Sequence, residues 1–260
     1  MKGLLPVLAA LAFTHPAAAK VKTEIVEYKQ GDIVLQGYLS YDESLTGKRP
    51  GVLVIHDWMG VSDDTKMRAE MLAGLGYVAL TADIYGKGVR PKDSQEAQAV
   101  AGKFSQDRAL LRARAKSGLD YLAARPEVDP GRIGAMGYCF GGRAALELAR
   151  SGAPLKGVVS FHGALSTPTP EDAKNIKGKV LVLHGADDPY VKQADVTAFM
   201  DEMRKGGVDW EVVQYSGAVH AFTIKAAGTD NSKGAAYNPQ ADKRSWEAMK
   251  DFWNEVFAGM

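Results

Sequence analysis

Short apolar runs alternate along this chain with segments in which apolar residues recur at helical spacing. Five of the runs are typical of strands buried on both faces of a sheet, at residues 51–56, 77–82, 132–137, 157–161 and 180–184. Three β-rich segments, at 24–28, 33–40 and 208–215, predict further strands, and the first two join as a hairpin at Gln30-Gly31-Asp32. Helices are predicted at 62–75, from Asp93 onward, at 111–122, 140–149 and 191–204, and around Trp246 and Trp253 near the end.

This alternation predicts an α/β fold with a mostly parallel central sheet, helices on both faces and an antiparallel N-terminal hairpin. Residues 126–131, which include Pro126 and Gly131, are predicted to interrupt regular structure before the strand at 132–137. The chain shows no internal repeat and no low-complexity linker. Residues 20–260 are therefore predicted to form a single domain.

The first nineteen residues have the layout of a secretory signal peptide. Lys2 provides a positive start, residues 4–13 are apolar, and Ala17-Ala18-Ala19 supplies small residues before Lys20. The apolar run is about half of the roughly 20 residues needed to span a bilayer, and no later run is long enough. The pattern predicts cleavage after Ala19 and a periplasmic or secreted protein. The alternative is a frayed N-terminal helix of a cytoplasmic protein.

Composition narrows the function classes. Of 260 residues, 46% are hydrophobic and 24% are charged, which excludes a disordered chain. Lys plus Arg is 32 and Asp plus Glu is 31, so no basic field indicates nucleic acid as a partner. A single cysteine allows neither an internal disulfide nor a cysteine-rich zinc site, and the histidines lack close metal-ligand spacing. No metal and no cofactor are predicted, and a monomer is the default.

The most informative motif is Gly137-Tyr138-Cys139-Phe140-Gly141-Gly142, where a predicted strand meets a predicted helix. A nucleophile between two glycines at such a junction is typical of the nucleophile elbow, a tight turn that lifts the side chain clear of the sheet. The start of the following helix directs free N–H groups at the sulfur. The alternative reading is a small buried cysteine without chemistry.

An elbow nucleophile needs an acid and then a histidine later in the chain. The predicted strand at 180–184 is followed by Asp187 and Asp188, and either could orient the histidine, although Asp187 could instead cap a turn. The strand at 208–215 is followed by His220, the only histidine after His184. His56, His162 and His184 each lie at a predicted strand end and are interpreted as structural.

With these residues in place, the chain resembles the dienelactone hydrolase family, which has the α/β-hydrolase fold. The resemblance spans the mature domain and depends on Gly-Tyr-Cys-Phe-Gly-Gly, His-Gly-Ala-Asp-Asp-Pro-Tyr-Val and Gly-Ala-Val-His-Ala-Phe. It implies Cys139, Asp188 and His220 as the catalytic triad. It also implies that the backbone N–H groups of Trp58 and Phe140 form the oxyanion hole.

Three features depart from the family pattern. Asp57 stands where the family has a glutamate that pairs with the resting thiol, so the resemblance implies Asp57 as that partner. The resemblance implies that Lys87 replaces an arginine that binds the substrate carboxylate, and a second arginine is absent, with Ile224 and Lys225 nearby. A lysine lacks the bidentate fork of arginine, which argues against dienelactone itself as the substrate.

The sequence thus predicts a cysteine-dependent hydrolase of small carboxylic esters or lactones that works through a thioester. One alternative is a thiol peptidase or acyltransferase with the same triad. Another is a catalytically silent small-molecule-binding protein.

Overall fold

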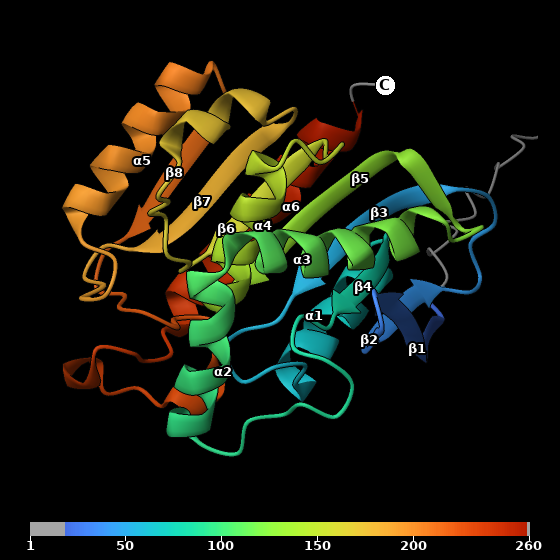
Figure 1. Ribbon diagram of the computed structural model, residues 1–260, viewed down its shortest axis with the longest axis horizontal. Helices are drawn as coiled ribbons and strands as arrows, with labels where there is room; N and C mark the ends of the chain where they lie inside the picture. The colour runs from blue at the N-terminus through green and yellow to red at the C-terminus, as the bar shows by residue number, and fades with distance from the viewer. Residues whose placement is uncertain (1–18, 259–260) are drawn as a thin grey trace, which may run out of the picture.

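The computed structural model describes residues 19–258, in which one eight-stranded sheet forms the centre of the molecule (Figure 1). The strands are β1 (Val21–Gln30), β2 (Ile33–Asp42), β3 (Arg49–Ile55), β4 (Val78–Ala82), β5 (Val128–Tyr138), β6 (Gly157–Phe161), β7 (Lys179–Gly185) and β8 (Trp210–Tyr215). Their order across the sheet is β1-β2-β4-β3-β5-β6-β7-β8. β1 and β2 form an antiparallel hairpin, β2 pairs antiparallel with β4, and all other neighbours are parallel.

Helices cover both faces of this sheet. The α-helices are α1 (Asp63–Gly74), α2 (Ser94–Gln106), α3 (Arg108–Ala123), α4 (Phe140–Arg150), α5 (Gln193–Gly206) and α6 (Pro239–Ala258). Short 3₁₀ helices are η1 (Pro170–Asn175), η2 (Lys225–Ala227) and η3 (Asn231–Lys233). α1 and α6 share one apolar core with one face of the sheet, and α2, α3, α4 and α5 share the other. Strands enclosed in this way must be apolar throughout, which explains their continuous hydrophobic runs.

The predicted α/β architecture is confirmed, with one local correction. The strand expected at 132–137 begins earlier, at Val128, because Val128 pairs with Arg49 at the start of β3 before a register shift. A bulge of this kind accommodates Pro130 and Gly131 inside a strand. The helices predicted from Asp93 onward and at 111–122 are α2 and α3, which meet where Asp107 ends α2 and its side chain accepts a hydrogen bond from the Leu110 N–H of α3.

The predicted signal peptide, except Ala19, lies outside the described residues and stays a prediction. Within residues 19–258, no helix is both long enough and apolar enough to cross a membrane.

The sheet topology places the loops that follow β3, β5, β7 and β8 at one edge. These four strands run parallel, so their carboxyl ends meet there. This edge is where ligands bind in open α/β sheets. The predicted site residues Asp57, Cys139, Asp188 and His220 each lie just beyond one of these strand ends.

Candidate active site

Cys139 occupies a sharp turn between β5, which ends at Tyr138, and α4, which begins at Phe140. Its backbone has φ 53° and ψ −111°, a conformation that side chains rarely adopt. A hydrogen bond of 3.0 Å from the Cys139 N–H to the Phe161 carbonyl oxygen holds the turn against β6. Strain of this kind persists only where the surroundings enforce it, and it presents the sulfur at the sheet edge.

The glycines of the motif are required by close backbone approach. A Cβ atom on Gly137 would overlap the carbonyl group of Gly141, and a Cβ on Gly141 would overlap the carbonyl oxygen of Ile55. These neighbours are backbone atoms, which cannot rotate away as a side chain can. The two glycines therefore let α4 start directly above β3 and β5.

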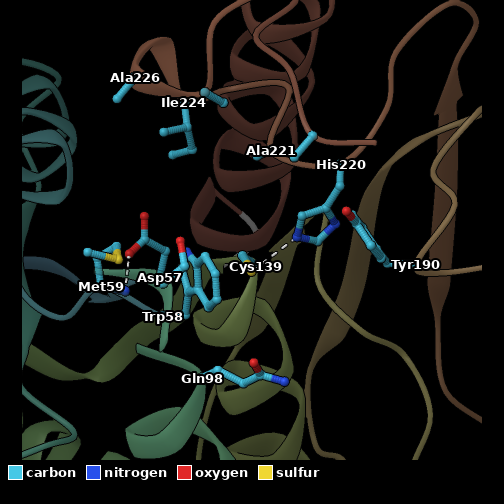
Figure 2. A pocket seen from close by; sticks show the side chains of 13 residues that line it. Asp57, Trp58, Met59, Gln98, Cys139, Tyr190, His220, Ala221, Ile224 and Ala226 are labelled. Atoms are coloured by element: carbon cyan, nitrogen blue, oxygen red, sulfur yellow. Dashed lines mark hydrogen bonds between the residues drawn. The ribbon is translucent and has the colours of Figure 1, made fainter. Parts of the chain in front are cut away.

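The structure brings Cys139, His220 and Asp188 into one hydrogen-bonded line (Figure 2). His220 Nε2 lies 3.1 Å from Cys139 Sγ, and His220 Nδ1 lies 2.8 Å from Asp188 Oδ2. A carboxylate only accepts, so Nδ1 carries a proton and donates it to Asp188. The other ring nitrogen, Nε2, then faces Cys139 Sγ.

The aspartate that meets His220 is the second of the pair. Asp188 is buried, and its Oδ1 accepts hydrogen bonds from the N–H groups of Tyr190 (2.8 Å) and Val191 (3.1 Å). Asp187 instead accepts a 2.9 Å hydrogen bond from the Gly217 N–H and so secures the turn after β8. The choice between the two aspartates that the residues alone left open is thus settled geometrically in favour of contact between Asp188 and His220.

The environment of His220 favours its protonated form. Burial lowers the pKa of the imidazole, but hydrogen bonds to Asp188 and Cys139, with the charges of both groups, outweigh that cost and raise the pKa to about 10. A protonated imidazole next to a sulfur atom stabilises the thiolate form of a cysteine.

Trp58 lines the cavity together with Cys139, and Phe140 follows Cys139 in the chain. Phe140 is the first residue of α4, where a helical N–H has no partner within the helix. Trp58 lies in the loop after β3, and the Tyr85 hydroxyl donates a 2.9 Å hydrogen bond to its carbonyl oxygen. Neither N–H donates to an acceptor among residues 19–258. Both groups are available to a ligand atom near Cys139.

Asp57 lies in the same loop, but the structure does not pair it with the thiol. Its Oδ1 accepts a 2.8 Å hydrogen bond from the Met59 N–H, while the sulfur contacts His220. The resting-thiol partner that the family resemblance assigned to Asp57 is, in this structure, His220. The aspartate is one methylene shorter than the expected glutamate, and the backbone N–H of Met59 donates a hydrogen bond to it.

Burial raises the pKa of Asp57 from 3.8 to about 6, with a smaller contribution from nearby Asp64. A carboxyl group with a raised pKa in the folded state destabilises the protein where it ionises, which is above pH 6. Each pKa unit is worth about 1.4 kcal/mol, so D57N should raise the free energy of unfolding by about 3 kcal/mol at pH 8. At pH 4 the gain should be about 0.5 kcal/mol, because folded Asp57 is then almost fully protonated and unfolded Asp57, with a pKa of 3.8, is only partly ionised. Urea unfolding at both pH values would measure this, and an equal gain at each would contradict it.

Lys87 does not line the site, which corrects the prediction that it binds substrate. Its Nζ forms a 2.7 Å ion pair with Glu27 on β1, and both side chains are about half exposed. The Lys87 N–H donates to the Val34 carbonyl oxygen at 2.9 Å, which ties this turn to the N-terminal hairpin. The side chain is thereby directed to the surface of the hairpin and away from Cys139.

A cavity of about 650 Å³ opens over the sulfur. It is lined by Asp57, Trp58, Met59, Ser94, Gln98, Cys139, Tyr190, His220, Ala221, Ile224, Ala226, Ala227 and Ala235. Sequence reasoning missed Ser94 and Gln98, which come from α2, and Tyr190, whose ring meets the His220 ring edge-on at 5.5 Å. Tyr190 could have been found, since it lies two residues after Asp188 in a motif already identified. Nothing local marked Ser94 or Gln98.

The other described histidines are buried, as expected of structural residues. His56 accepts a 3.1 Å hydrogen bond from the Ile84 N–H at Nε2 and contacts the Asp57 carbonyl oxygen through Nδ1 at 2.6 Å. It thus holds the loop that carries Asp57 and Trp58, and burial lowers its pKa to about 4. His162 bonds Thr223 through Nε2 at 2.8 Å and packs edge-on against His220.

Known proteins are similar to this chain in fold and sequence over most of its length. A solved structure named m3DLH is 44% identical, with a TM-score of 0.88 over 92% of this chain and 99% of that one. A dienelactone hydrolase-like promiscuous phosphotriesterase from metagenomic libraries is 41% identical, with a TM-score of 0.86 over 91% and 99% of the two chains. A Synechocystis protein provisionally named a carboxymethylenebutenolidase is 25% identical over 90% of this chain and 96% of its own. The family model of the dienelactone hydrolase family matches residues 35–257. The chain is therefore a hydrolase that belongs to the dienelactone hydrolase family.

Proposed function

We propose that this hydrolase cleaves carboxylic esters or lactones with Cys139 as the nucleophile, His220 as the proton carrier and Asp188 as the residue that orients His220. The observation that carries the proposal is the continuous contact from Asp188 through His220 to Cys139 at the floor of a cavity. The provisional name of the Synechocystis relative adds support for lactone chemistry. The triad logic is that of other nucleophilic hydrolases.

In the first half-reaction the Cys139 thiolate attacks the carbonyl carbon and forms a C–S bond, while the carbonyl π electrons move to oxygen. The N–H groups of Trp58 and Phe140 stabilise that oxyanion, and one such donor is worth about 3–4 kcal/mol in a comparable hydrolase. The intermediate collapses, the C–O bond to the leaving group breaks, and His220 Nε2 gives its proton to the departing oxygen. A thioester of Cys139 remains.

In the second half-reaction water attacks the thioester carbonyl while neutral His220 accepts one of its protons. Collapse of this second intermediate breaks the C–S bond and returns the thiolate beside the imidazolium. Asp188 holds the Nδ1–H tautomer throughout, so that Nε2 faces the reacting atoms. The products are a carboxylic acid and an alcohol, joined as one hydroxy acid when the substrate is a lactone.

A panel of substrates tests this assignment against its alternatives. We expect steady turnover of 4-nitrophenyl esters and simple lactones, with 4-nitroanilides of the same acyl groups cleaved at least about 10²-fold more slowly, because an amide has the poorer leaving group. Faster cleavage of the anilides would favour a thiol peptidase. Binding of the esters without turnover would indicate a silent binding protein.

A second candidate is the hydrolysis of neutral phosphotriesters. It is favoured by the 41% identical structure named a promiscuous phosphotriesterase, which matches nearly the full length of both chains. A neutral aryl phosphotriester added to the same panel tests it. Turnover below that of every carboxylic ester would leave the ester as the preferred substrate class.

A further inference from the structure

The cavity over Cys139 has an unusual charge composition for a site expected to receive a carboxylate. Its walls are mainly apolar, from residues such as Trp58, Met59 and Ile224, and Ser94 and Gln98 add neutral polar groups. Within the described part of the chain, the lining includes no lysine and no arginine. Asp57 contributes the carboxylate of this lining, and His220 contributes its imidazole.

The Asp57 carboxylate is fixed and has no cationic partner. The Met59 N–H binds Oδ1 at 2.8 Å, and no lysine or arginine among residues 19–258 lies within ion-pair distance of either oxygen. Figure 2 shows Asp57 and His220 on opposite sides of Cys139 in this view, with the Trp58 ring next to the sulfur. Asp57, Cys139 and His220 all line the same cavity, so a substrate that reaches Cys139 enters a space that this carboxylate also borders.

Charged groups outside the lining also act on this region: Arg143 on α4 interacts electrostatically with Cys139, and its side chain donates a 2.9 Å hydrogen bond to Ser105. Asp64 on α1 acts on Asp57 with the same sign of charge. Lys225, next to the lining residues Ile224 and Ala226, is near Asp64 rather than Asp57. Lys87, the expected cation, is bound to Glu27 outside the cavity.

We propose that Asp57 is a specificity-determining residue that selects uncharged esters and lactones and excludes substrates that carry a carboxylate. This rests on the proposed ester hydrolysis and names its substrate class. Like charges in a partly desolvated cavity repel by more than in water, so a carboxylate in the acyl group should reduce kcat/KM by about tenfold or more. Neutral substrates avoid that repulsion and gain from the apolar walls.

The test compares 4-nitrophenyl hexanoate with the mono-4-nitrophenyl ester of adipic acid at pH 8. The two esters share leaving group and acyl chain length and differ at the far end, methyl against carboxylate. We expect the wild-type protein to favour hexanoate by about tenfold or more in kcat/KM, after correction for spontaneous hydrolysis, and D57N to reduce that ratio by about fivefold. Asparagine keeps the oxygen that accepts the Met59 N–H, so the loop should persist.

D63N is the matched control, because it removes the same charge from a fully exposed side chain only six positions along the chain. Its ratio should equal that of the wild type. A ratio unchanged in D57N, or a wild-type preference for the adipate ester, would overturn the proposed role of Asp57 while leaving ester hydrolysis intact.

Alkylation separates failure of this proposal from failure of the proposed function, because it needs no turnover. The chain has a single cysteine, so modification by iodoacetamide or iodoacetate reports Cys139 alone. D57N should increase the rate with anionic iodoacetate relative to neutral iodoacetamide by about threefold or more, and D63N should not. Turnover of neither ester would contradict the proposed function, and an unchanged alkylation ratio would independently contradict charge selection by Asp57.

Discussion

Cys139→Ala is expected to lower kcat for 4-nitrophenyl esters by at least about 10³-fold, and His220→Ala by a similar factor, as when members of a catalytic triad are removed. The reason is geometric: the sulfur and Nε2 lie 3.1 Å apart, and in the proposed mechanism they act together, so loss of either would remove covalent catalysis. The double variant should be little worse than either single variant. Steady-state kinetics on all three proteins measures this, with circular dichroism as a check on folding.

Asp187 provides a matched control for Asp188, the residue that contacts His220. In Asp188→Asn, the amide oxygen can still accept the hydrogen bonds from the N–H groups of Tyr190 and Val191. The substitution disturbs the tautomer of His220, so kcat should fall by about 10²-fold or more. Asp187→Asn, one position away, keeps an oxygen for the Gly217 N–H and should stay within about twofold of wild type. Equal losses in the two variants, or near-full activity in His220→Ala, would mean that another base serves Cys139.

Gly141→Ala is expected to cost about 3 kcal/mol or more of folding free energy and most of the activity. The added methyl group would meet the backbone oxygens of Ile55 and His56, so α4 must move away from β3 to accept it. That movement displaces Cys139 and the Phe140 N–H together. Differential scanning calorimetry should show a melting temperature lower by about 10 °C.

Gly102→Ala is the control for this substitution. Gly102 lies within α2, and a Cβ there would meet no atom within 4 Å. Alanine is favoured over glycine in a helix, so this variant should gain about 0.5–1 kcal/mol. A Gly141→Ala protein as stable and active as Gly102→Ala would refute the view that close backbone packing dictates the elbow glycines.

Features that depend on local pattern were predictable from the sequence. The buried strands are recognised by their apolar runs, and Gly137, Cys139 and Gly141 identify the turn because its steric demands are local. The order of the strand ends along the chain then identified His220. The preference for Asp188 over Asp187 needed the family resemblance, and the coordinates show the physical difference: one aspartate faces the imidazole and the other faces the Gly217 N–H.

Features that depend on three-dimensional neighbours were not predictable. Lys87 lies near a predicted strand end, yet its direction is decided by Glu27 on β1, which lies sixty positions earlier. The partner of Asp57 depends on how the loop after β3 folds back so that the Met59 N–H reaches the carboxylate. Ser94 and Gln98 line the cavity because α2 packs beside it. No motif in the sequence of α2 indicates that position.

The central claim is that Cys139 forms the covalent intermediate, and rapid-quench mass spectrometry of the acylated protein tests it most directly. After mixing with a 4-nitrophenyl ester and acid quench, the account predicts one acyl group per chain on the peptide that contains Cys139, released by hydroxylamine and absent in Cys139→Ala. An acyl group on a serine, threonine or lysine would contradict this claim. Full turnover by protein whose Cys139 has been alkylated would contradict it as well.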